Sequence, residues 1–158
     1  MSEASCGFET DSGRSGQREL ELSGPTLTVQ IEEHRALVPI GGGLRSSTDQ
    51  LYNALIDTGA DASCIDWELA ERLGLEVCDE QNVTGVHGPQ LARYYAAKIY
   101  VPELDYDSWG EFAGLMLSEH NFAHDAILGR DFLKSFVMVY EGDTGIVTIN
   151  WRQRSTSF

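Results

Sequence analysis

Apolar and polar residues alternate over several stretches of this chain, which is the pattern of half-buried β-strands. In residues 26–31 every second residue is apolar, and residues 91–101 form a longer stretch that reads as a strand. Near the end of the chain, the β-prone runs 136–140 and 146–151 flank a polar Gly-Asp-Thr-Gly tip, which predicts a hairpin. Most of the predicted elements are therefore short strands.

Two segments depart from the strand pattern and predict short helices. Asp66 is suited to be a helix N-cap, the apolar residues that follow it share one helical face, and Gly74 is placed to end the helix. A second short helix is predicted directly after Gly129. Together with about seven to nine short strands, these helices predict an all-β protein built as a small closed barrel or sandwich.

The composition divides the chain into a central domain and two tails. Residues 1–24 are rich in Ser, Gly and Glu and poor in apolar residues, so they are predicted to form a disordered tail, with a removable leader as the alternative. The domain is predicted to span residues 25–151, followed by a C-terminal tail over residues 152–158. A chain of 158 residues with 42% hydrophobic content has enough apolar material for one core.

Net charge limits the kinds of partner that the chain can bind, and cysteine content indicates its cellular compartment. The chain has 25 acidic and 11 basic residues, a formal net charge of -14, which disfavours binding to the phosphate backbone of nucleic acids. No apolar run is long enough to span a bilayer, and the N-terminus lacks the pattern of a secretory signal. Three cysteines without metal-ligand spacing indicate a reducing compartment. We therefore expect a cytoplasmic protein that binds neither nucleic acid nor membrane.

The strongest chemical signal is the segment 54–61, Ala-Leu-Ile-Asp-Thr-Gly-Ala-Asp. An apolar strand here delivers Asp57 into a turn, and a carboxylate at the end of a buried strand is costly unless it is hydrogen-bonded or has a chemical role. Thr58 offers a hydroxyl, and Gly59 lets neighbouring groups approach closely. The same triplet recurs at residues 143–145, where the β-prone flanks favour a hairpin turn. Asp57 is therefore the candidate catalytic residue.

A second motif, Ala-Ile-Leu-Gly-Arg-Asp-Phe-Leu at residues 126–133, accompanies the first. The pair of motifs resembles the two signatures of retropepsin-like aspartic proteases, the single-lobe family of retroviral proteases and their cellular and bacterial relatives. The resemblance covers about residues 26–151. It implies the retropepsin type of β fold and an aspartic endopeptidase that cleaves an extended peptide, with no metal and no organic cofactor.

The resemblance also implies how catalysis would be organised. Hydrolysis needs one carboxylate to take a proton from water and another to protonate the leaving nitrogen, and two carboxylates about 3 Å apart retain one proton between them. The chain has one credible catalytic signature and is too short for a two-lobed enzyme. We therefore expect a homodimer in which Asp57 of each copy forms the catalytic pair, with the terminal hairpin 136–151 as the candidate dimer surface.

Residues near Asp57 take supporting roles by resemblance. Thr58, Gly59 and Ala60 would form the rest of the catalytic loop, with Gly59 contacting the substrate or the carboxylate through its backbone. Asp61 would pair with Arg130 of the second motif, a charge-assisted hydrogen bond that ties the loop to the following helix.

The segment around residues 85–88 lies at the position of the family's flap, the mobile hairpin that closes over a bound peptide. A plain surface hairpin is the alternative for this segment. The candidate substrate-binding residues at its tip are Gly85, Val86, His87 and Gly88.

Two further alternatives concern metal binding and the loss of catalysis. His120 and His124 have a spacing that can hold a metal on a helix, but no third ligand accompanies them, so no metal site is predicted. A catalytically weak or inactive peptide-binding scaffold on the same fold is the alternative to a peptidase.

Overall fold

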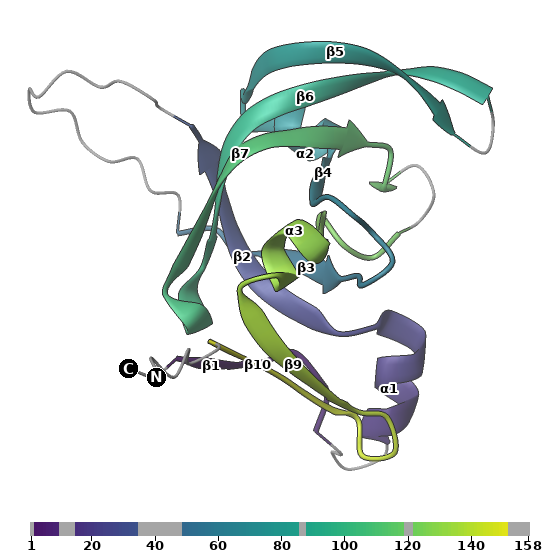
Figure 1. Ribbon diagram of the computed structural model, residues 1–158, viewed down its shortest axis with the longest axis vertical. Coiled ribbons are helices and arrows are strands. Elements are labelled where there is room, and N and C mark those ends of the chain that lie inside the picture. Colours follow the sequence, from purple (N-terminus) through teal and green to yellow (C-terminus); the bar gives the residue numbers. More distant parts are fainter. Residues whose placement is uncertain (1, 10–14, 35–48, 86–87, 119–121, 152–158) are drawn as a thin grey trace, which may run out of the picture.

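The computed structural model describes residues 2–9, 15–34, 49–85, 88–118 and 122–151. In this part of the chain, ten strands form two sheets, of seven and three strands, and the helices are short (Figure 1). None of the described helices has the length and apolar content needed to cross a bilayer.

The larger sheet closes on itself into a barrel. Its strand order is β2-β3-β8-β4-β7-β6-β5, and β2 also pairs with β6, so the first six strands form a ring and β5 extends beyond it. A turn of 3-10 helix, η1 (Pro102–Leu104), links β6 to β7. The strands of this sheet are β2 (Thr26–Glu33), β3 (Tyr52–Ile56), β4 (Cys64–Asp66), β5 (Glu76–Gly85), β6 (Gly88–Val101), β7 (Tyr106–Leu115) and β8 (Ala126–Leu128).

Alternating apolar side chains fill the barrel, because successive residues of a strand point to opposite faces of the sheet. On β2, Leu27, Val29 and Ile31 are buried while the residues between them are partly exposed. On β6, Tyr95 and Ile99 are buried in the same core. Removing these side chains from water drives closure of the ring. The prediction of an all-β protein with a small closed barrel is confirmed.

Both predicted short helices are present. Helix α2 (Trp67–Arg72) begins after Asp66, whose carboxylate accepts a hydrogen bond from the Leu69 amide at 3.1 Å and so caps the helix. The chain leaves this helix through Gly74, which has a φ of 65° that glycine adopts readily. Helix α3 (Arg130–Leu133) follows β8 at the second motif.

The smaller sheet lies below the barrel in Figure 1 and contains both ends of the described chain. Its antiparallel order is β1 (Glu3–Ser5), β10 (Ile146–Trp151) and β9 (Phe136–Glu141). The predicted terminal hairpin is thus present as β9 and β10, with β1 added on the far side of β10. Within the part of the chain that the structure describes, β9 is an edge of this sheet.

The described part of residues 1–24 is not a disordered tail, so that prediction is wrong. Strand β1 pairs with β10, and helix α1 (Gly16–Ser23) follows in the same segment. Ala4, Cys6 and Leu20 are at most 2% exposed and belong to the hydrophobic core. The predicted C-terminal tail, residues 152–158, lies outside the described residues.

The glycines of this segment explain why its composition was misleading. A Cβ on Gly16 would overlap the carbonyl oxygen of Phe8, and one on Gly7 would overlap the carbonyl oxygen of Gly145. These glycines therefore allow backbones to pack closely and do not mark a flexible chain. A few apolar side chains suffice here because they complete a core that β9 and β10 already supply.

Candidate active site

Strand β3 delivers Asp57 to the end of the barrel next to β8. The two strands pair in parallel, and the Asp57 amide donates to the Leu128 carbonyl oxygen at 3.0 Å. The half-buried Asp57 carboxylate accepts a hydrogen bond from the Gly59 amide at 2.7 Å. A Cβ on Gly59 would lie 3.0 Å from the same carboxylate oxygen, so glycine leaves room for this contact. Gly59 thus contacts the carboxylate through its backbone.

The parallel pairing of β3 and β8 brings the two sequence motifs together. The Arg130 amide donates to the Ala60 carbonyl at 2.9 Å, and the Asp131 amide donates to the Asp61 carbonyl at 3.2 Å. A Cβ on Gly129 would lie only 2.9 Å from the Ala60 carbonyl oxygen, which is closer than side-chain carbons normally approach backbone. The catalytic loop and the start of α3 are therefore held in direct contact.

Arg130 holds this loop in a different way from the one predicted. Its guanidinium Nη1 donates to the carbonyl oxygens of Thr58 and Gly59, both at 2.9 Å. The Asp61 carboxylate instead accepts from the Ala62 amide at 3.0 Å. Within the described residues Asp61 and Arg130 form no ion pair, so the predicted pairing is wrong. The turn exposes two carbonyls that need a donor, and Arg130 satisfies them while Asp61 caps its own turn.

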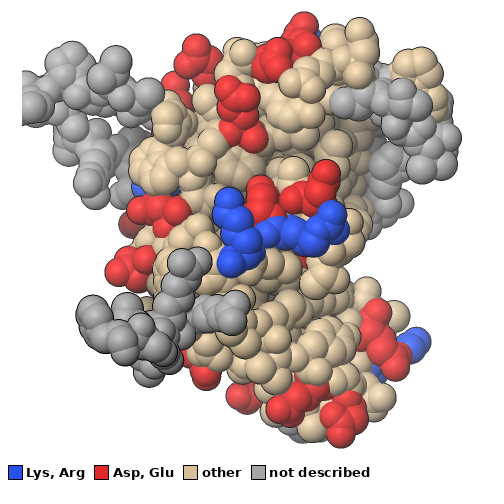
Figure 2. All heavy atoms as spheres, viewed as in Figure 1, with Lys and Arg blue, Asp and Glu red and all other residues tan. Residues whose placement is uncertain are grey.

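Basic side chains lie close to α3. Figure 2 shows acidic side chains scattered over this face, whereas basic side chains gather near its centre, at the position of α3. Arg130 at the start of α3 and Lys134 at its end are basic, and acidic side chains adjoin the central basic group in the same view.

Replacing Arg130 by Ala should lower the stability of the folded protein by about 1 kcal/mol, because two carbonyl oxygens lose their charged donor. Chemical denaturation followed by tryptophan fluorescence would measure the change. Lys134→Ala is the matched control, since it removes a neighbouring exposed cation without touching the loop carbonyls. Equal stabilities of the two variants would contradict the role given to Arg130.

Sequence reasoning missed a second link between the motifs. The buried Ser63 hydroxyl donates to the Asp131 carboxylate at 2.6 Å and accepts from the Gly129 amide at 3.0 Å. The same Asp131 oxygen accepts from the Phe132 amide at 2.8 Å and so also fixes the start of α3. The signal was present in the sequence as the acid that follows Arg130 in the second motif.

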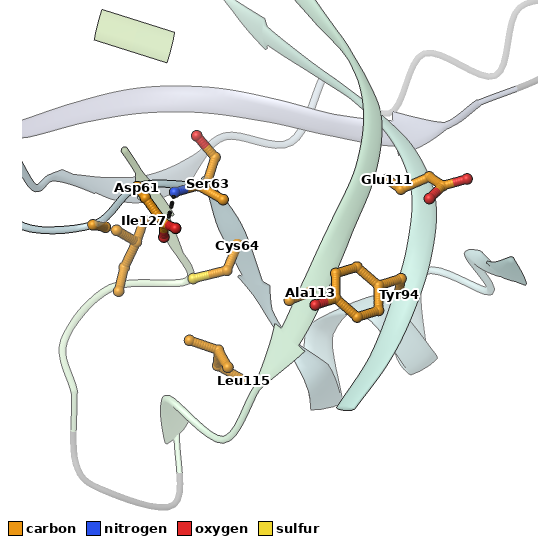
Figure 3. Close-up of a pocket in the computed structure, with 10 residues that line it drawn as sticks. Asp61, Ser63, Cys64, Tyr94, Glu111, Ala113, Leu115 and Ile127 are labelled. Atoms are coloured by element: carbon orange, nitrogen blue, oxygen red, sulfur yellow. Dashed lines mark hydrogen bonds between the residues drawn. The ribbon is translucent and has the colours of Figure 1, made fainter. Parts of the chain in front are cut away.

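A cavity of about 280 Å³ adjoins the catalytic loop (Figure 3). Residues 60–64 form one side of it, and β6 and β7 contribute the opposite side with Tyr94, Glu111 and Ala113. Cys64 also lines it. Burial raises the pKa of the Cys64 thiol to about 12, and the carboxylates of Asp131 and Asp57 add to this shift, so the thiol stays neutral.

The predicted flap coincides with a hairpin of the barrel sheet. Strands β5 and β6 pair along their length up to the pair formed by Gly85 and Gly88. Gly88 has a φ of 99°, a backbone conformation that side chains with a Cβ rarely adopt. Val86 and His87 lie outside the described residues. The hairpin rises from the strand that carries Tyr94, and therefore from the wall of the cavity.

Two other sequence candidates lie outside the catalytic loop. Asp143 is in the turn between β9 and β10, as the flanking strands predicted. His124 is buried, its Nε2 lies 2.8 Å from the Thr26 hydroxyl, and burial lowers the pKa of the ring. His120, the other member of the considered metal pair, is outside the described residues.

Solved structures with a similar fold include three proteases. The protease of simian foamy virus (mac) is 13% identical, with a TM-score of 0.44, covering 69% of this chain and 91% of the viral one. The EIAV protease, in complex with an inhibitor, is 23% identical, with a TM-score of 0.41, covering 70% of this chain and 85% of the EIAV protease. A retropepsin-like aspartic protease from Rickettsia conorii is 14% identical, with a TM-score of 0.44, covering 80% of this chain and 93% of the Rickettsia protein. No curated protein matches the chain.

A family model described as aspartyl protease matches residues 46–132. The match spans more than half of the chain and includes Asp57 with its loop as well as Gly129 and Arg130. These are the residues that the parallel pairing of β3 and β8 brings into contact. The chain therefore belongs to the aspartyl protease family.

Proposed function

We propose that this protein is an aspartic endopeptidase that hydrolyses peptide bonds with a water molecule activated by a pair of Asp57 carboxylates. The observation that carries the proposal is the placement of Asp57 at the end of β3, where the Gly59 amide orients its carboxylate and the residues that follow the turn, 60–64, line an open cavity. A carboxylate held by one backbone donor keeps its other oxygen available for water and substrate.

The proposed reaction uses one ionised and one protonated carboxylate. The ionised member takes a proton from water as the water oxygen attacks the peptide carbonyl, and the protonated member donates to the carbonyl oxygen. The tetrahedral intermediate then collapses as its nitrogen receives a proton, which releases an amine and a carboxylic acid. Because two carboxylates about 3 Å apart cannot both ionise, the pair holds the single proton that this cycle needs and titrates as one unit.

The second carboxylate of the pair would come from a second copy of the chain. The other Asp-Thr-Gly triplet lies in the β9–β10 turn, at the end of the molecule away from the β5–β6 hairpin (Figure 1), so it is poorly placed to assist Asp57. A symmetric homodimer supplies an equivalent Asp57 across a two-fold axis.

Strand β9 supports the proposed dimer because, among the described residues, it is an edge of the smaller sheet. Its outward side chains Val137 and Val139 are 44% and 45% exposed, and Ile146 of the neighbouring strand is 43% exposed on the same face. An edge strand with exposed apolar side chains is prone to pair with another chain unless it is covered. The β9–β10 hairpin is therefore the proposed dimer surface.

The substrate would be an extended peptide lying beneath the β5–β6 hairpin, which would act as the flap. An extended peptide can add to a strand edge through its backbone and place alternate side chains in pockets. Water is the only other reactant, so the reaction needs no metal or organic cofactor. A cytoplasmic location is proposed as well, and the free thiols of Cys6, Cys64 and Cys78 fit a reducing compartment.

Specific activity should fall when the protein is diluted below the dissociation constant of the dimer, because a single copy holds half of the catalytic pair. Val139→Glu should move the midpoint of this dilution curve to at least about tenfold higher concentration, since a charge would be buried at the proposed interface. Peptide cleavage over a concentration series, with molar mass from analytical ultracentrifugation, measures both effects.

The matched control for this experiment is Val77→Glu. Val77 is 41% exposed but lies on β5 of the barrel sheet, so the same substitution should leave the dilution midpoint in place. Activity per mole that stays constant down to concentrations where the protein is monomeric would refute the shared active site.

A further inference from the structure

The cavity beside the catalytic loop combines apolar walls with carboxylates. Ala113, Leu115 and Ile127 provide apolar surface from β7 and β8. Asp61, directly after the catalytic loop, and Glu111, on the opposite strand wall, lie on different sides of it (Figure 3). The cavity of about 280 Å³ has room for one long side chain.

The Asp61 carboxylate is only partly satisfied by the protein. One of its oxygens accepts the Ala62 amide at 3.0 Å, and in the described part of the chain neither Asp61 nor Glu111 forms an ion pair. Arg130, the cation that contacts the catalytic loop, donates instead to the carbonyl oxygens of Thr58 and Gly59. Asp61 is exposed, so water completes its hydrogen bonds while the cavity is empty.

When a substrate side chain enters this cavity, its chemistry determines whether the Asp61 carboxylate still has a hydrogen-bond donor. A leucine or methionine would displace water from Asp61 and leave a charged acceptor uncompensated, which costs free energy. A lysine or arginine would lay its methylenes against the apolar walls and bring a cationic donor to the carboxylate. A long basic side chain therefore both packs against the apolar walls and donates to the Asp61 carboxylate.

We propose that this cavity selects a lysine or arginine of the substrate peptide, and that Asp61 is the residue that determines the preference. The inference rests on the proposed peptidase function and specifies its substrate class: peptides with a basic residue close to the scissile bond. Asp61 contacts the substrate side chain in this proposal and takes no part in the proton transfers.

The overall charge of the protein is a separate source of attraction for basic peptides and has to be distinguished from the cavity. A net charge of -14 draws cations to every part of the surface, but at physiological salt such attraction is screened over about 8 Å. Removing one acid far from the cavity should therefore change little, whereas removing Asp61 should change the preference itself.

The test compares peptides that differ only in having Lys, Arg, Met or Glu at one position, scanned along the residues flanking the cleavage site. The wild-type protein should favour Lys or Arg over Met by about tenfold in kcat/KM at one position. In Asp61→Asn this ratio should fall to about twofold or less, and the Asn oxygen still accepts the Ala62 amide, so the loop is preserved. The ratio should persist in Asp107→Asn, which removes an exposed acid of β7 that does not line the cavity.

The same peptides with a reduced, non-cleavable bond separate this inference from the proposed reaction. Their affinities, measured by fluorescence anisotropy, should show the same preference for Lys or Arg and the same loss in Asp61→Asn. Basic preference in binding without any cleavage would support the cavity assignment and contradict the peptidase. An equal response to Met and Lys peptides in both assays, or a preference that survives Asp61→Asn, would overturn the cavity assignment.

Discussion

Asp57→Asn should reduce peptide cleavage by at least about a thousandfold, because the substitution removes the group that both accepts and donates protons in the proposed reaction. Asn has nearly the same shape as Asp and keeps an oxygen that can accept the Gly59 amide hydrogen bond. The loop geometry, the melting temperature and the dimer should therefore be retained. Single-turnover cleavage of a fluorogenic peptide would measure the loss, with molar mass and thermal unfolding recorded on the same samples.

The chain supplies its own control for this experiment. Asp143 belongs to the second copy of the Asp-Thr-Gly triplet, in the β9–β10 turn, so Asp143→Asn makes the same chemical change away from the cavity. Because this turn belongs to the proposed dimer surface, both variants are assayed well above the dissociation constant of the dimer, where Asp143→Asn should keep wild-type activity. Full activity in Asp57→Asn would place the catalytic acid elsewhere. A wild-type protein that binds peptides but cleaves none at any pH would favour the scaffold alternative.

The local structure of the Asp57 loop could be predicted from sequence because its constraints are local. The Asp-Thr-Gly turn after an apolar strand, and the Gly-Arg-Asp segment after another, carry their own constraints in a few neighbouring residues. The contact between the two motifs follows once β3 and β8 are adjacent and parallel, since their ends then lie side by side. The alternation of buried and partly exposed residues along β2 could also be predicted, because every second residue is apolar over the six residues 26–31.

The partner of Arg130 could not be predicted because the choice depends on geometry. A sequence shows that an acid and a base share a region, but it does not show which carbonyls a turn leaves without donors. The turn at Thr58 and Gly59 exposes two such carbonyls within reach of the guanidinium, and Asp61 is engaged with its own turn. The general expectation of opposite charges pairing was therefore misleading.

The cavity and the N-terminal segment were missed for a different reason, which is that both depend on long-range pairing. Tyr94 and Glu111 line the cavity opposite residues 60–64 only because β6 and β7 complete the barrel, and nothing local marks them as parts of the same cavity as Asp61. Residues of β1 look like tail by composition, yet they are ordered by pairing with β10, more than a hundred residues later in the sequence. Composition averages cannot detect such pairing.

Gly129→Ala should lower both the stability and the activity of the protein, because it disturbs the close contact between the two motifs. The new methyl group would lie 2.9 Å from the carbonyl oxygens of Ala60 and Ala62, so the backbone of the catalytic loop would have to move. Overpacking of this kind costs about 1 to 3 kcal/mol of folding stability. A displaced loop should also lower kcat/KM by about a hundredfold, because proton transfer requires accurate positioning of Asp57. Urea denaturation at fixed protein concentration and peptide cleavage would measure the two losses.

Backbone strain does not contribute to the effect expected for Gly129→Ala. Gly129 has a φ of -92° and a ψ of -164°, an extended conformation that alanine also adopts, so any effect must come from the added methyl group. Gly110→Ala on β7 is the matched control, because a Cβ there meets no atom within 4 Å and the substitution should leave stability equal or slightly increased. If Gly129→Ala retained both the stability and the activity of the control, the close contact between α3 and the catalytic loop would not be needed to hold Asp57 in its working position.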